Sequence, residues 1–370
     1  MPDNVKPSRL ELRLETEIST ATSGLEADCK RAELAAYRVR LGRVEEAELT
    51  LKELRERYAA HPHVAISAWL NLVEGLVGHF GDMDPGSRDK ILRAHALSSA
   101  AGLLPMRALT AAWLAHFDYA RLDLEAAEAH VRLALAGSNQ NDDSVRSRAS
   151  LVVAQVLHLA GRFDMAKPWY IGSRLHANRE GDSATVGAIL HNMAWLHMSI
   201  FRQRYFASDL APKQDLNILM SAESTRNFDQ LFRISTLTSL EPILRAQIFS
   251  LRGQWAEALE LYNVHFSGST IRGASRFLGI LLSDQALCRL KIGDRSHASE
   301  DALAASQLLN DDTQIDDRAF AHSRLAQVYD ALKDFSEVRR HRELATNSWR
   351  KFESLQEKII ENYGDIHLSP

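Results

Sequence analysis

The chain contains fifteen histidines, the residues best suited to bind a metal or to transfer a proton near neutral pH. A tetrahedral zinc site needs several ligands at close spacing. His61 and His63 flank Pro62 with no Cys or carboxylate that completes such a set, and His191 and His197 lie six positions apart, on opposite sides of a helix. The sequence therefore predicts no metal site, and we expect no cofactor.

Motifs for phosphate binding or nucleophilic catalysis do not occur in the sequence, which has no GxxxxGK[ST], no GxGxxG after a strand and no GxSxG. The carboxylate pairs lie where helices are expected to begin, and N-capping and the helix dipole explain them. They are Asp142 with Asp143, Asp311 with Asp312, and Asp316 with Asp317. Cys29 and Cys288 are too far apart in a linear array to form a disulfide or a thiolate metal site. We expect no catalytic residue and no enzyme activity.

The composition is that of a folded protein, with 45% hydrophobic and 25% charged residues and only 9 prolines and 18 glycines in 370 residues. A formal net charge of −4 argues against a broad nucleic-acid surface, and the basic residues from Arg339 to Lys351 are interpreted as a solvated helix face. The first residues lack a secretory signal, and no window holds about 18 uninterrupted apolar residues. We expect a cytoplasmic protein that binds neither membrane nor nucleic acid.

A six-residue phrase of the form Gly-x-(aromatic or aliphatic)-x-x-Ala recurs along the chain. The copies are GRVEEA at 42–47, GRFDMA at 161–166, GQWAEA at 253–258 and GDRSHA at 293–298, with weaker copies LDLEAA at 122–127 and KDFSEV at 333–338. Helical periodicity on both sides predicts a tight turn between two antiparallel helices, in which Gly adopts the left-handed conformation that ends the first helix. Leu122 and Lys333 replace this Gly, which leaves the turn geometry open at those two copies.

A small residue stands twelve positions before the last residue of each phrase. These residues recur about every 40 positions, and the same interval adds Gly75 and Ala194 where no phrase occurs. They stand at Ala35, Gly75, Ala115, Ala154, Ala194, Ala246, Ala286 and Ala326, at intervals of 40, 40, 39, 40, 52, 40 and 40. A small side chain is needed where two helix backbones cross closely. The spacing predicts an all-α solenoid of about eight antiparallel helix pairs. The interval of 52 predicts an insertion near 201–215, either a tolerated surface segment or a contact element.

Each pair resembles the tetratricopeptide repeat (TPR), through the small residue, the Ala twelve positions later and a large residue four further on. These large residues are Leu51, Val131, Tyr170 and Tyr262, and the helix at 188–197 is the most similar to the family. The resemblance covers residues 28–353, in units near 40 residues instead of the family's usual length of about 34. It implies a right-handed superhelix whose first helices line a concave groove that binds peptides or helices of partner proteins.

The register projects one set of residues from the first helix of each pair onto the inner wall, which also includes Leu72 and Leu76. The candidate groove residues are Trp113, His116, Tyr119, Gln155, His158, His191, Asn192, Trp195, Met198, Gln247 and Arg324. Trp113, Tyr119, Trp195 and Met198 are the expected anchors, unless their side chains fill space between helices. The resemblance implies that Asn192 pairs with a bound peptide backbone, and the alternative is that its amide satisfies a carbonyl of a neighbouring helix. Imidazoles from three successive pairs favour a pH-sensitive groove over a metal site.

The two ends are predicted to differ from the repeats. Residues 1–27 contain a capping helix at 8–24, and the last repeat continues in a long helix from Phe335 to about Tyr363, with an extension and tail at 354–370. Three interpretations fit its apolar stripe: a cap on the seventh and eighth pairs, a homodimerisation helix, or a linker to an output domain.

The sequence therefore predicts a scaffold that binds a protein or peptide in its groove, as an adaptor or regulatory module. The alternative is a receptor for a small molecule or signalling peptide, in which ligand binding alters the superhelix and an interaction elsewhere. Groove residues vary freely on this scaffold, so the sequence does not name the partner.

Overall fold

The computed structural model describes residues 7–82, 84–207, 241–265, 275–311 and 313–366. These residues form sixteen α-helices and one short π-helix, η1 (Gly78–Asp82), with no strand in the same ranges. The N-terminal helices are α1 (Arg9–Thr20), α2 (Gly24–Arg40), α3 (Val44–Arg57), α4 (Val64–Val77), α5 (Ser87–Ala100), α6 (Leu104–Ala120), α7 (Leu124–Ala136), α8 (Asp143–Leu159) and α9 (Phe163–Glu180). The others are α10 (Ser183–Ala207), α12 (Glu241–Leu251), α13 (Trp255–His265), α14 (Ser275–Lys291), α15 (Arg295–Leu308), α16 (Ile315–Leu332) and α17 (Phe335–Tyr363). The protein is all-α, as predicted.

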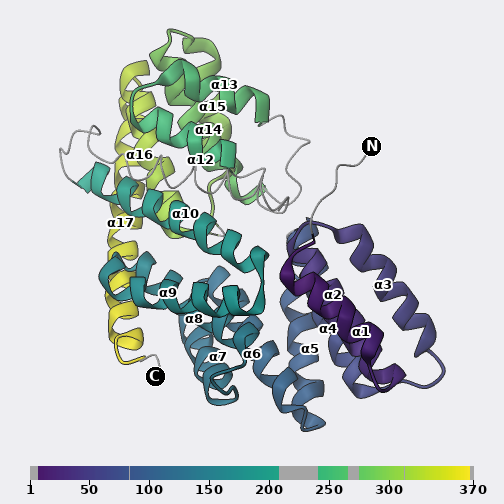
Figure 1. The fold of residues 1–370 in the computed structure, drawn as a ribbon. Helices are drawn as coiled ribbons and strands as arrows, with labels where there is room; N and C mark the ends of the chain where they lie inside the picture. The colour runs from purple at the N-terminus through teal and green to yellow at the C-terminus, as the bar shows by residue number, and fades with distance from the viewer. Residues whose placement is uncertain (1–6, 83, 208–240, 266–274, 312, 367–370) are drawn as a thin grey trace.

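Helices that follow one another in sequence pack together in pairs (Figure 1). The pairs are α2 with α3, α4 with α5, α6 with α7, α8 with α9, α12 with α13, α14 with α15, and α16 with α17. Several first helices also pack on the first helix of the next pair, as α2 does on α4, α6 on α8 and α14 on α16. This sequential packing is consistent with a helical repeat.

The turns between paired helices fall on the recurring phrases. Gly42, Gly161, Gly253 and Gly293 open the four phrases that begin with glycine, and all have a positive φ. The two weaker copies use the same conformation, because Leu122 (φ 58°) and Lys333 (φ 68°) are the non-glycine residues with positive φ in the described chain. The predicted turn positions are thus confirmed, including those where the sequence left the geometry open.

All eight small residues of the register are buried within helices. Gly75 shows why: a Cβ added there would lie 2.5 Å from Cδ1 of Ile91 and 2.9 Å from the carbonyl oxygen of Ser87, both on α5. Real Cβ atoms do not approach other heavy atoms so closely, so α4 and α5 cross at this level only because residue 75 has no side chain. The prediction that small residues mark close helix crossings is confirmed at Gly75, and the seven alanines are buried as it requires.

The long C-terminal helix has the predicted bounds, and most of its apolar stripe packs against other helices of the same chain, although Ile360 is exposed. α17 runs beside α16 and then along α8 and α7 (Figure 1). Phe352, Ile359 and Tyr363 are fully buried there, and the Tyr363 hydroxyl donates to the Leu124 carbonyl at 3.0 Å. The helix therefore covers the third and fourth pairs as well as the eighth, whereas a cap was expected on the seventh and eighth.

Other contacts join pairs that are distant in the sequence. Near the N-terminus, the Tyr37 hydroxyl and Ser183 Oγ are 2.8 Å apart. Farther along, Arg202 on α10 pairs with Asp317 on α16 at 2.9 Å, and both side chains are buried. The helix α10 thus contacts α2 through Ser183 and α16 through Arg202, which links the beginning and the end of the chain to its middle.

The expected segment boundaries are partly described. α2 begins at Gly24, so the first pair starts before the boundary expected at residue 28. α1 packs against α2, at the place of the expected cap. Phe201 to Ala207 of the expected insertion belong to α10, and residues 208–215 lie outside the described ranges.

One described window, Val64–Gly81, is long and apolar enough to cross a membrane by length and composition alone, with a mean hydropathy of 1.2. Its residues Leu72, Val73 and Leu76 are fully buried in a cluster shared with α2, α5 and α6. Packing in the core therefore accounts for these apolar residues, although only 33% of the window is buried.

Candidate functional site

Most of the predicted groove residues are part of the core. Seven of them are buried: Trp113, Gln155, His158, His191, Met198, Gln247 and Arg324. His116, Tyr119, Asn192 and Trp195 are partly buried. An extended partner in an open groove needs exposed side chains to pack on, so in this conformation these residues do not form the open inner wall that the register projects.

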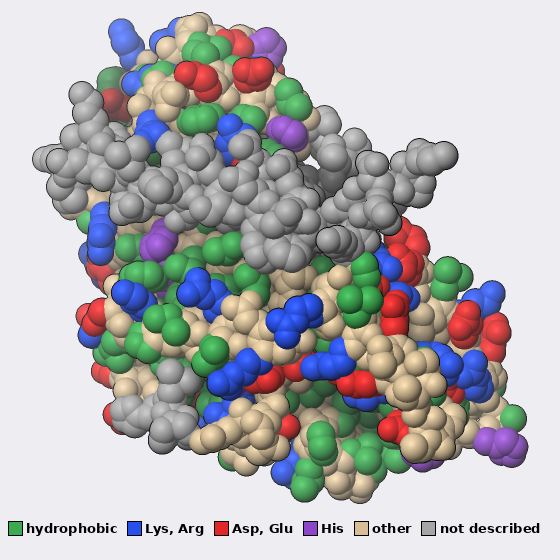
Figure 2. All heavy atoms as spheres, in the orientation of Figure 1, with side chains coloured by type: hydrophobic (Ala, Val, Ile, Leu, Met, Phe, Trp, Pro, Cys, Tyr) green, Lys and Arg blue, Asp and Glu red, His purple; other side chains and the backbone are tan. Residues whose placement is uncertain are grey.

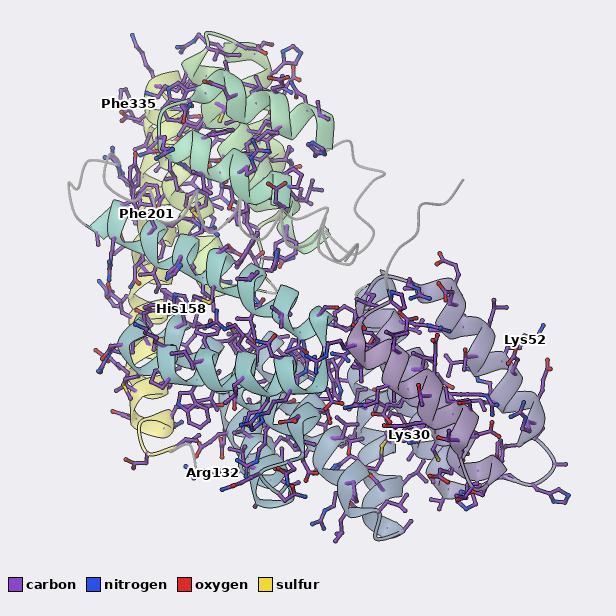
Figure 3. All side chains as sticks on the ribbon, in the orientation of Figure 1. Lys30, Lys52, Arg132, His158, Phe201 and Phe335 are labelled. Carbon is purple, nitrogen blue, oxygen red and sulfur yellow. The ribbon has the colours of Figure 1, made fainter. Side chains whose placement is uncertain are left out.

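The histidines expected along the groove do not converge. His158 Nδ1 lies 3.1 Å from the Tyr170 hydroxyl, and its ring packs on Phe163 and His197 between α8, α9 and α10 (Figure 3). His191 instead stacks on Trp195, with ring centroids 6.3 Å apart. In the described part of the chain, no group of three or more His, Cys, Asp or Glu could hold a metal ion.

Burial keeps these imidazoles neutral. Desolvation, with a contribution from His197, lowers the pKa of His158 to about 3, and desolvation lowers the pKa of His191 to about 4. The pKa of His116 falls well below its usual value for the same reason, assisted by the nearby His79. A group of this kind stays uncharged at physiological pH, so these three histidines do not form a switch near pH 6.5.

Arg324 belongs to a closed polar network in the C-terminal half. Its guanidinium lies 2.9 Å from the carboxylate of Asp284, and neither side chain is exposed to solvent. The same carboxylate accepts hydrogen bonds from Ser250 at 2.8 Å and from Tyr262 at 2.7 Å. The four residues come from α12, α13, α14 and α16, so the network ties three helix pairs together.

The expected anchors Trp195 and Met198 also pack inside. Met198 is buried in a cluster with Leu244, Ile248 and Phe320, and Trp195 packs against this cluster. The Trp195 ring lies 6.0 Å from the ring of Phe277. Trp195 and Met198 therefore fill space between helices, which was the alternative to their role as exposed anchors.

A cavity lies between the first helices of the first four pairs. It measures about 50 Å³ and lies between α1, α2, α4, α6, α8 and the turn from α9 to α10. Its apolar lining comes from Leu10, Leu14, Ala36, Trp69, Leu72, Leu76, Leu109 and Trp113, and its polar lining from Glu33, Tyr37, Arg40, Ser144, Arg148, Glu180 and Asp182. Leu72, Leu76 and Trp113 were predicted for the inner wall, so the register located part of this site.

Three other lining residues occupy the same position in their repeats, so the sequence could have predicted them. Trp69, Leu109 and Arg148 each stand six residues before the small residue of their pair, Gly75, Ala115 and Ala154. This position is four residues before the one occupied by Trp113 in the third pair, so it lies on the same helix face. The expected set stopped three positions before the small residue and therefore omitted Arg148.

Two arginines and one aspartate form the charged side of the cavity. Arg40 pairs with Asp182 at 2.5 Å, and Asp182 caps α10 by accepting from the Thr185 amide at 2.9 Å. Arg148 donates only to the Thr185 hydroxyl, at 3.3 Å. The positive charge of Arg40, together with its hydrogen bond, outweighs burial and keeps the pKa of Asp182 below its usual value.

Arg148 is the residue that the sequence did not single out. Its guanidinium carbon lies 3.9 Å from the centroid of the Trp113 ring, a cation–π contact, and the residue is 5% exposed. Burial, with a smaller contribution from Arg40, lowers its pKa to about 9. That value is above physiological pH, so the side chain carries its charge inside the protein.

The face of the molecule drawn in Figure 2 carries charges of both signs. Figure 2 shows basic and acidic side chains interspersed over the described part of this face, without a continuous stripe of one sign. Charged side chains arranged in this way are typical of a solvated surface. The described part of this face therefore shows no charged stripe that would mark a site of specific recognition.

No protein-family model matches this sequence, and no curated protein matches it. The proposal for its function therefore rests on the geometry of the chain itself.

Proposed function

We propose that the chain is a right-handed TPR-like solenoid without enzyme activity, and that it acts as a receptor for a small molecule or the end of a signalling peptide. The sequential helix pairs and the turns at the recurring phrases support the solenoid. The buried small residues about every 40 positions support the same architecture. The ligand site is the cavity beside Trp113 and Arg148.

The observation that carries this proposal is a cavity between the first helices of four successive pairs. A volume of about 50 Å³ has room for a few water molecules or a small functional group. An extended peptide in a continuous groove needs much more space, and the side chains expected to line such a groove are largely buried. This geometry favours the receptor over the adaptor.

Ligand binding at this position also has a route to a response. The cavity is lined by α2 and α4 on one side and by Arg148, Glu180 and Asp182 on the other. A ligand that touches both sides stabilises the arrangement in which they are close, relative to any more open one. The first two pairs would thereby be fixed against the middle of the chain.

A pocket-filling variant tests the proposal. Ser144 lines the cavity and is only partly buried, so Ser144→Phe places a ring in the site without removing a core side chain. Ser299→Phe is the matched control, because Ser299 is exposed on α15. Each protein is incubated with a lysate of its native host, repurified and examined by native mass spectrometry.

We expect a low-mass or peptide ligand on the wild type and on Ser299→Phe but not on Ser144→Phe. Retention of the same ligand by Ser144→Phe would show that the cavity is not the site. Recovery of only a stable protein partner, equally by all three proteins, would support the adaptor instead.

A further inference from the structure

We propose that the cavity recognises a carboxylate group on an apolar body, and that Arg148 is the residue that pairs with it. This inference rests on the proposed receptor function and specifies the chemistry of its ligand. It is carried by the charges around the cavity, by the contacts of Arg148 and by the nature of the remaining walls.

The first step is the balance of charge. Three carboxylates line the cavity, and each lies beside a cation: Glu33 pairs with Lys30 at 2.9 Å, Glu180 pairs with Arg13, and Asp182 pairs with Arg40. Lys30 and Arg13 are shared, because both also pair with Glu17. Arg148 has no ion pair with any carboxylate in the described chain. Its charge is the one positive charge of the lining that lacks a direct counter-ion.

The second step is the state of Arg148 itself. A buried charge without a partner is costly, so most proteins pair it or do not bury it. Here the guanidinium uses one donor on Thr185 and places its face on Trp113. Its other N–H donors have no acceptor among the residues that the structure describes, although the side chain is 5% exposed and lines the cavity. A planar guanidinium with free donors matches the two oxygens of a carboxylate.

The third step separates a carboxylate from a phosphate. Arg148 carries a single positive charge without an ion pair in the described chain, so a monoanion is enough to pair with it. A dianion would add a second negative charge near Glu33, Glu180 and Asp182 and would be repelled. The small volume of the cavity also favours the smaller, planar group.

The fourth step concerns the body of the ligand. Trp69, Leu109 and Leu76 line the same cavity, and apolar walls of this kind stabilise an aliphatic or aromatic group by removing it from water. Two sources supply a carboxylate on such a body: a free organic acid, and the C-terminus of a peptide with an apolar last residue.

The experiment uses probes that separate charge from shape. Benzoate is compared with benzamide, its neutral counterpart, and with inorganic phosphate; Gly-Ala-Leu with a free C-terminus is compared with the amidated peptide. Binding to the full chain is measured by isothermal titration calorimetry. We expect benzoate or the free-acid peptide to bind with a Kd below about 1 mM, at least about tenfold more tightly than its neutral counterpart and more tightly than phosphate.

Two variants test Arg148. Arg148→Met removes the charge and keeps the length of the side chain, and should weaken binding by about 10- to 100-fold, the usual cost of losing a charge-assisted pair. Arg148→Lys keeps the charge without the planar donors and should bind with intermediate affinity. Arg174→Met, on the exposed side of α9, should bind as the wild type does. Circular dichroism confirms that each variant is folded.

The outcomes are distinct. Binding of benzoate alone identifies a free acid, and binding of the free-acid peptide alone identifies a chain end. If no probe binds the wild type, or if Arg148→Met binds as tightly as Arg174→Met, the carboxylate inference is overturned. If Arg148→Met still retains the native ligand while Ser144→Phe loses it, the receptor function stands and only the carboxylate inference fails.

Discussion

The two halves of the molecule bury arginine in opposite ways. In the C-terminal half, Arg324 meets Asp284, and a second carboxylate, that of Asp317, meets Arg202; all four side chains are buried. In the N-terminal half, Arg148 is almost as buried but lies on Trp113 without an ion pair in the described chain. A paired buried cation serves the fold, whereas an unpaired one keeps its charge available for a ligand.

The largest expected effect compares the two arginines directly. Arg324→Met leaves the Asp284 carboxylate buried without its cation, which should lower the free energy of unfolding by about 3–5 kcal/mol. Arg148→Met should change it by no more than about 1 kcal/mol, because relief of an unpaired buried charge offsets the lost contact with Trp113. Urea denaturation measures both. Equal losses for the two variants would show that Arg148 is as structural as Arg324.

A pH series sharpens the comparison, because the C-terminal half also holds a neutral imidazole pair. His322 Nδ1 and His341 Nδ1 lie 3.0 Å apart, and burial lowers their pKa values to about 3 and about 4. The folded pair therefore binds fewer protons than the unfolded chain. Its contribution to stability is complete above about pH 6.5 and is lost as the pH falls toward 4.

Each histidine of this pair should cost about 2–3 kcal/mol of stability between about pH 6.5 and pH 4.5. His341→Gln should make the fall in unfolding free energy shallower over this range, as measured by urea denaturation at each pH. His297→Gln, at an exposed position on α15, serves as the control. A slope that is the same in both variants would contradict the assignment.

A smaller effect tests the helix that connects the halves. Tyr363→Phe removes the hydroxyl that donates from α17 to the Leu124 carbonyl, and should cost about 1 kcal/mol because the buried carbonyl loses its partner. Tyr58→Phe removes a hydroxyl that donates to the Asp28 carboxylate. It should cost less, because that carboxylate keeps Arg31 and Arg57 as partners. Thermal unfolding compares them. Equal melting temperatures for the wild type and Tyr363→Phe would show that this contact does not couple the halves.

The smallest effects come from the two left-handed turns without glycine, one in each half. Lys333→Gly should raise the free energy of unfolding by up to about 1 kcal/mol, because Lys333 is exposed and only its backbone conformation is costly. Leu122→Gly should raise the free energy of unfolding by less, because the substitution also removes a side chain that packs against the core. A loss of stability in Lys333→Gly, measured by urea denaturation, would contradict the account of this turn.

Local features of the fold were predictable because each is encoded by neighbouring residues. The recurring phrases located six left-handed turns, and the spacing of small residues located the close crossings. The apolar stripe of the last helix gave its bounds, Phe335–Tyr363. Periodicity reports which residues share a helix face, and this is a property of a few consecutive turns.

The inner wall was predicted less well, for a physical reason. The register named the helix face of Trp113, Trp195 and Met198, but it could not tell whether that face is open. The curvature of a repeat array is the sum of small rotations between neighbouring pairs, and local patterns do not fix these rotations. Contacts such as those of Tyr363 and Arg202 also bring together segments that are far apart in the sequence.

The sequence by itself determined the helices, their pairing, the turns and the positions that face inward. Only the tertiary structure decided which inward positions remain accessible, because that depends on segments far apart in the chain. Arg148 is the clearest case: its repeat position is readable from the sequence, but its lack of an ion pair depends on Asp182 being held by Arg40, 142 positions away. Local patterns place a side chain on a face, and long-range packing decides what that side chain meets.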